Sequence, residues 1–165
     1  MFQSLTTLRA PMASRFRLAS LLGAGVNQQA RIEALRPVNQ TRLFEALGEA
    51  GITHLTVIFT GLGAAARIDS IAPWAGSLAV ELPGASLRYA VLIWDAPEVE
   101  WRNLTLAETV EQIVLDLLCD PDLRKAMPGG AEGEFCIDAK ARTVHLEINE
   151  LSAPFDAACL QGPST

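Results

Sequence analysis

One apolar run closed by glycines, Gly51 to Gly63 (GITHLTVIFTGLG), constrains the fold of this chain most strongly. The run is rich in the β-branched and aromatic residues that strands favour, among them Ile52, Val57 and Phe59. A continuous apolar run of this length with glycines at both ends is typical of a strand buried on both faces. We therefore predict a central core strand here, followed by a hairpin turn and a second strand over residues 66–71.

The segment before this strand has the spacing of an amphipathic helix. Leu43, Phe44 and Leu47 lie on one side of a helix over Asn39 to Ala50, and charged residues lie elsewhere. Asn39 suits the N-cap of this helix, and Gly51 suits the position just after it, where a positive φ is needed. The sequence thus predicts a helix that ends at Gly51 and leads directly into the core strand.

The flanking segments set the limits of the domain. A shorter helix is predicted over residues 27–36, and Pro37 ends it because the residue before a proline disfavours the helical region. Residues 1–26 are rich in arginine and have an interrupted apolar run, which predicts a loosely ordered N-terminal segment rather than an export signal. Residues 152–165 predict a C-terminal tail, which leaves residues 27–151 as a single α+β domain.

Turn and capping signals organise the middle of the chain. Pro83-Gly84 predicts a hairpin over residues 78–94, and residues 95–103 are predicted to form a loop.

A capped helix follows over residues 105–119. Thr105 and Glu108 have the spacing of a capping box, and the apolar positions that follow recur at helical spacing. The acids of this helix, including Asp116, lie mainly off the apolar stripe and are predicted to face solvent. Together the elements predict an α+β fold, an antiparallel or mixed sheet of about five to six strands with two main helices packed on one face.

The last predicted element is a hairpin with one buried face, because apolar and polar residues alternate over 134–139 and 142–149. With Lys140-Ala141 as its turn, Glu134 faces Glu147 and Cys136 faces His145 on the polar side. Like charges directly opposite one another destabilise a sheet unless they splay into water, so a basic partner group or a metal ion between them is the alternative.

The candidate binding residues of this hairpin are therefore Glu134, Cys136, Asp138, His145, Glu147 and Glu150. Glu134, His145 and Glu147 are also the candidate metal ligands, because carboxylates and imidazoles bind divalent metals. No catalytic residue and no cofactor is predicted. The chain has only two histidines and no GxSxG motif, which argues against nucleophilic catalysis. Its three cysteines are widely spaced and form no CxxC pair, which favours a reducing compartment, the cytoplasm.

The net charge of −6 is unevenly distributed. Up to Phe44 six arginines stand against one acid, whereas the remainder has seven basic and eighteen acidic residues, a net charge of −11. An acidic body disfavours direct binding of nucleic acid and favours a basic protein partner. The apolar runs are too short to span a membrane, which needs about 20 residues.

With these segments identified, the chain resembles an uncharacterised bacterial family, a domain of unknown function found on plasmids and integrative conjugative elements. The resemblance covers about residues 38–150 and rests on Leu43 to Gly63, on the capped helix and on Gly133 to Glu150. The family carries Asp where this chain has Thr60, and Asp-Ser-Gly where it has residues 64–66, so the acidic loop of the family is lost here. The resemblance implies a mobile-element context and no established activity.

These observations predict a small acidic cytoplasmic binding protein, an accessory factor of a mobile element that acts on a protein partner. Its sharpest form is an inhibitor of a host defence complex, of the antirestriction or anti-CRISPR type that imitates nucleic acid. Two alternatives stay open: a metal-dependent or thiol enzyme that uses the polar face of the last hairpin, and a structural homodimer that pairs through an exposed sheet edge.

Overall fold

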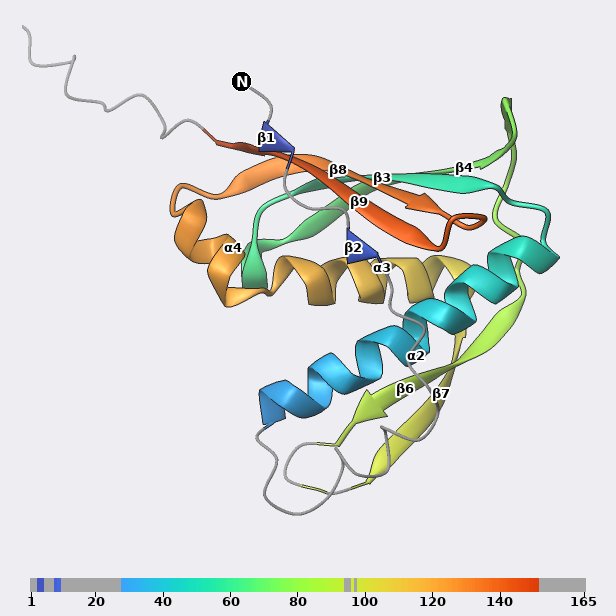
Figure 1. The fold of residues 1–165 in the computed structure, drawn as a ribbon, viewed down its shortest axis with the longest axis horizontal. Helices are drawn as coiled ribbons and strands as arrows, with labels where there is room; N and C mark the ends of the chain where they lie inside the picture. The colour runs from blue at the N-terminus through green and yellow to red at the C-terminus, as the bar shows by residue number, and fades with distance from the viewer. Residues whose placement is uncertain (1–2, 5–7, 10–27, 94–95, 97, 152–165) are drawn as a thin grey trace, which may run out of the picture.

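The computed structural model describes residues 3–4, 8–9, 28–93, 96 and 98–151, and its helices lie against one face of an antiparallel sheet (Figure 1). Across this sheet the order is β9 (Thr143–Glu150), β8 (Ala131–Asp138), β3 (His54–Thr60), β4 (Arg67–Ala75) and β5 (Leu78–Ala79). The two-residue strands β1 (Gln3–Ser4) and β2 (Leu8–Arg9) both pair with β9. The predicted α+β class, an antiparallel sheet with its main helices on one face, is thereby confirmed.

The helical layer consists of α2 (Gln28–Glu49), α3 (Leu106–Leu118) and the short α4 (Pro121–Ala126). Beyond α2 lies a two-stranded ribbon of β6 (Ser86–Leu92) and β7 (Val99–Thr105) (Figure 1). The core lies between the main sheet and the helices, and its largest fully buried side chains include Leu43, Leu47, Leu55, Phe59, Val110, Val114, Phe135 and Ile137.

Strand β3 is central, since it pairs with β4 on one side and with β8 on the other. Its side chains alternate: Leu55, Val57 and Phe59 are fully buried, whereas Ile58 is 44% exposed. The prediction that this strand is buried on both faces was therefore wrong. Because the helices cover only one face of the sheet, the alternate side chains of β3 face outward despite the apolar sequence.

Helix α2 runs unbroken through Pro37, so the prediction of two helices separated by this proline was wrong. Pro37 cannot donate a backbone hydrogen bond, but Leu35, Leu43 and Phe44 are buried on either side of it. Packing along the whole helix thus outweighs the local cost of the proline. Asn39, predicted as an N-cap, lies inside the helix and is 4% exposed.

The predicted end of this helix is confirmed. Gly51 has a φ of +74°, and the N–H of Ile52 donates to the carbonyl of Leu47 at 2.9 Å, the bond of a Schellman motif. The glycine turn after β3 is also confirmed, with Gly61 and Gly63 both at positive φ. At Gly61 an added Cβ would lie 2.3 Å from a backbone carbonyl oxygen, so no larger residue fits.

Strand β4 continues past the predicted 66–71 and includes Pro73. The carbonyl of Pro73 accepts from Val80 on the side of β5, a strand that pairs with β4 only at Trp74 and Ala75. The backbone N–H that Pro73 lacks would therefore lie on the side of β5, near the edge of the sheet, where strands tolerate a proline.

The predictions of a hairpin over residues 78–94 and of a loop over residues 95–103 were both wrong. Residues 78–79 pair with β4, and β6 instead pairs with β7, which contains most of the predicted loop. Strand β7 (VEWRNLT) carries exposed polar residues and lacks a clear apolar alternation, so its sequence gave little strand signal.

Two contacts attach the ribbon to α2. The side chain of Asn39 accepts from the N–H of Ala90 at 2.8 Å and donates to its carbonyl at 2.9 Å. On the surface, Trp101 lies against the guanidinium groups of Arg42 and Arg88, whose carbons are 4.6 and 5.3 Å from its ring centroid. The predicted capping box at the start of α3 is confirmed, with reciprocal bonds between Thr105 and Glu108.

Candidate functional site

The register of the last hairpin is as predicted. Glu134 pairs with Glu147, Cys136 with His145 and Asp138 with Thr143, around a turn over residues 139–142. Because paired residues of antiparallel strands share a face, the first two pairs lie side by side on the face of the sheet away from the helices. We call this surface the open face.

The open face extends from the hairpin across β3 to β4. Ile58 is the partner of Glu134, Thr56 is the partner of Cys136, and His54 is the partner of Asp138. His54 in turn stacks on Trp74 of β4, with ring centroids 5.9 Å apart and planes within 5°. This part of the surface was not predicted, although the alternation of His54, Thr56 and Ile58 along the core strand was the available signal.

The two paired glutamates on the open face are not neutralised by lysine or arginine. Both are exposed, and in the described part of the chain no salt bridge joins either of them to a Lys or Arg side chain. The imidazole of His145 lies close by, with its Nε2 4.0 Å from the carboxylate of Glu147.

The remaining candidates have unequal roles. Asp138 accepts from the N–H of Ala141 at 2.8 Å and so stabilises the turn. Glu150 pairs with the buried Ala131, a register position of the helix-side face, and therefore does not join the other candidates.

Cys136 is half-buried, and this burial raises the pKa of its thiol, with further contributions from Asp138, Glu134 and Glu147. A raised pKa disfavours the thiolate, which is the nucleophilic form. Among the described residues, no three His, Cys, Asp or Glu side chains form a group suited to hold a metal ion. The enzyme alternative thus gains no support from this arrangement.

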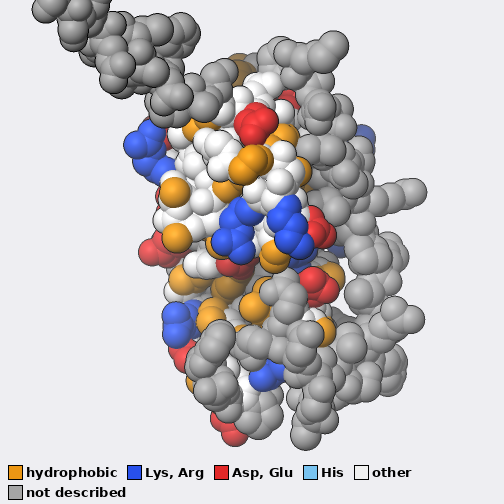
Figure 2. Space-filling model, turned by 90° about the vertical axis from the view of Figure 1, so that its left-hand side faces the viewer, with side chains coloured by type: hydrophobic (Ala, Val, Ile, Leu, Met, Phe, Trp, Pro, Cys, Tyr) orange, Lys and Arg blue, Asp and Glu red, His pale blue; other side chains and the backbone are white. Residues whose placement is uncertain are grey.

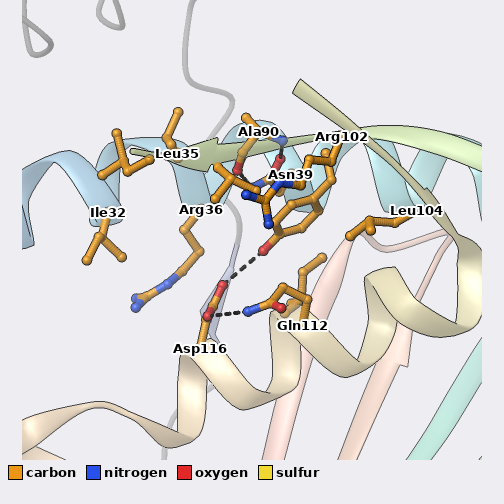
Figure 3. Close-up of a pocket in the computed structure, with 13 residues that line it drawn as sticks. Ile32, Leu35, Arg36, Asn39, Ala90, Arg102, Leu104, Gln112 and Asp116 are labelled. Carbon is orange, nitrogen blue, oxygen red and sulfur yellow. Dashed lines mark hydrogen bonds between the residues drawn. The ribbon is translucent and has the colours of Figure 1, made fainter. Parts of the chain in front are cut away.

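A second feature was not predicted at all: a cavity of about 320 Å³ between α2, the ribbon and α3 (Figure 3). On its wall the hydroxyl of Tyr89 donates to Asp116 Oδ2 at 2.9 Å, and Gln112 Nε2 donates to Asp116 Oδ1 at 2.9 Å. Asp116 was predicted to face solvent, but it is half-buried and makes both of these bonds. Burial and the Asp116 carboxylate raise the pKa of Tyr89 well above its usual value.

One side of the molecule carries charges of both signs. The side of the molecule that bears α4 and the first turns of α2 shows Lys and Arg side chains interspersed with acids and hydrophobic groups (Figure 2). Among the described residues, no helix is both long enough and apolar enough to cross a membrane.

These features define a small antiparallel α+β protein with helices on one face of its sheet and the paired glutamates Glu134 and Glu147 on the other. The chain belongs to a family of unknown function (DUF6878), which it matches over residues 35–156. The prediction that the chain belongs to a family of unknown function is thereby confirmed. No curated protein and no solved structure matches the chain.

Proposed function

We propose that this chain is a cytoplasmic binding protein whose open face takes up a basic segment of a partner protein. The observation that supports this most directly is the pair of exposed glutamates, Glu134 and Glu147, which lie directly opposite one another and form no salt bridge with a described Lys or Arg. A lysine or arginine of the partner placed between the two carboxylates would remove their repulsion and form charge-assisted hydrogen bonds.

The surroundings of this pair suit a protein partner. Ile58 lies beside Glu134 and is 44% exposed, which offers apolar contact next to the charges. The stacked rings of His54 and Trp74 add a flat surface further along the same face. Interfaces commonly combine such an apolar centre with charges that set orientation and association rate.

A narrower form of the proposal places the chain among the accessory factors of mobile elements, as an inhibitor of a host defence complex that binds nucleic acid. The net charge of −11 after Phe44 supports it, because an acidic surface can occupy a basic groove built for phosphates. The test is whether the purified protein weakens nucleic-acid binding by restriction or CRISPR complexes of its host. Unchanged binding across these complexes would overturn this form alone.

The broader proposal is tested by affinity capture from host lysate. The wild type is compared with Glu134→Gln/Glu147→Gln, which keeps the side-chain shapes and removes both charges. The matched control is Glu45→Gln/Glu49→Gln, the same change at two exposed positions of α2. We expect a partner that the first variant loses and the control retains. Equal capture by all three proteins, or no specific partner for any, would contradict the proposal.

A further inference from the structure

The cavity between α2, the ribbon and α3 is separate from the open face, because the helices lie between the two (Figure 1). Its volume of about 320 Å³ is at the small end of the range for ligand sites. Most of its lining is apolar, from Ile32, Leu35, Val91, Leu92, Leu104 and Ile113. This size and lining fit a small molecule with an apolar part.

Among the residues that the structure describes, no salt bridge joins two charged groups of the cavity lining. Arg36 extends from α2 toward α3 (Figure 3), and its buried Nε has no hydrogen-bond partner. Asp116 accepts from the neutral groups of Tyr89 and Gln112, and no salt bridge among the described residues includes it. Arg102, the other charged lining residue, already donates to Glu100 at 2.7 Å.

Besides the already paired Arg102, one cation, Arg36, and one anion, Asp116, thus line the same small cavity without a salt bridge between them. A purely anionic ligand bound at Arg36 would lie near the Asp116 carboxylate, and a purely cationic ligand at Asp116 would lie near the guanidinium. Burial of a charge without a counter-charge is costly. A ligand that carries both charges provides a counter-charge for Arg36 and another for Asp116, and it adds no net charge to the cavity.

We propose that this cavity binds a small zwitterion with an apolar side chain, of the class of the apolar α-amino acids. The carboxylate of the ligand accepts from the guanidinium of Arg36, and its ammonium group donates to Asp116. The apolar side chain contacts the aliphatic lining. Ile32 and Gln112 are exposed and form the rim through which the ligand enters.

The test is calorimetric titration of the full chain with three matched probes: L-leucine, 4-methylpentanoate, which lacks the ammonium group, and isoamylamine, which lacks the carboxylate. We expect L-leucine to bind, and each analogue to bind at least about tenfold more weakly, since one lost charge contact of this kind is worth about that factor. Equal binding of L-leucine and either analogue, or no binding of any probe, would overturn the proposal.

Two variants test which side chain of the cavity binds each charged group of the ligand. Arg36→Gln should abolish the preference for L-leucine over isoamylamine, and Asp116→Asn should abolish the preference for L-leucine over 4-methylpentanoate. Arg42→Gln on the same helix and Asp122→Asn on α4 lie outside the cavity lining and should leave both preferences unchanged. Circular dichroism checks that each variant is folded. A merely structural role of Arg36 or Asp116 would weaken all three probes alike and so contradict the assignment.

Discussion

Polar groups on the open face differ in exposure and in bonding from those at the junction of α2 with the ribbon and α3. On the open face, Glu134 and Glu147 lie opposite one another, both are exposed, and neither forms a salt bridge with a Lys or Arg of the described segments. At the junction, Asn39 and Tyr89 are each 4% exposed, and each has a specific partner. Asn39 and Tyr89 thus hold the fold together, whereas the two glutamates are available to a second molecule.

The difference has an energetic basis. A buried polar group that loses its partner keeps its desolvation cost, about 1–3 kcal/mol, whereas an exposed group exchanges its partner for water. Polar residues at the junction should therefore be sensitive to substitution. Glu134 and Glu147 on the open face should be free to vary without loss of stability.

The largest expected effect is at Asn39. Asn39→Ala leaves both the N–H and the carbonyl of Ala90 without the side-chain amide that now bonds them. We expect a loss of about 2–4 kcal/mol in the free energy of unfolding, measured by urea denaturation. Asn149→Ala, at a half-buried position of β9, is the control and should change stability by less than about 0.5 kcal/mol. Equal effects of the two substitutions would remove the contrast between the regions.

The next effect is a pH dependence carried by Tyr89, the chain's single tyrosine. Its pKa is raised in the folded state, so above the ordinary value of about 10 the unfolded chain releases a proton that the folded chain keeps. Stability should therefore fall as the pH rises, by up to about 1.4 kcal/mol per pH unit from this group.

Denaturation of wild type and Tyr89→Phe at a series of alkaline pH values isolates this contribution, because the variant lacks the group. Tyrosinate absorbance reports the same residue directly and should appear together with unfolding. A tyrosine that ionises near its ordinary pKa in the folded protein would show that the junction does not exclude charge.

The smallest expected effect is on the open face. Glu134→Gln removes one of two like charges that face each other, so the free energy of unfolding should stay constant or rise by up to about 1 kcal/mol. Added salt should reduce any gain, because it screens the repulsion in the wild type. Glu49→Gln on α2 serves as the control for loss of a single exposed charge. Destabilisation by Glu134→Gln would mean that this carboxylate has a structural partner.

Sequence reasoning succeeded where partners are near in the chain. The hairpin of β8 and β9 has its turn and its alternation within one short segment, so its register followed from the pattern. The capping box at Thr105 and the glycine at position 51 are local signals of the same kind. Five of the six candidate residues of the hairpin were placed correctly with respect to its open side, and Glu150 lies at a position of the other side.

The junction could not be predicted in this way, because its contacts are distant in sequence. Asn39 and Ala90 are 51 residues apart, and Tyr89 and Asp116 are 27 apart. Pro37 gave a strong local signal for a helix end, and only the packing of the whole helix overrides it. The cavity depends on how α2, the ribbon and α3 come together, which periodicity within any one of them does not reveal.

The amide of Asn39 has a consequence beyond stability. The N–H and carbonyl of Ala90 point away from β7, in the direction where a further strand would extend the ribbon. The side chain of Asn39 bonds both groups and so takes the place that the backbone of a further strand would have. The hydrogen-bond ladder therefore stops at this point, and a second copy of the chain finds no template there from which ordered aggregation could grow.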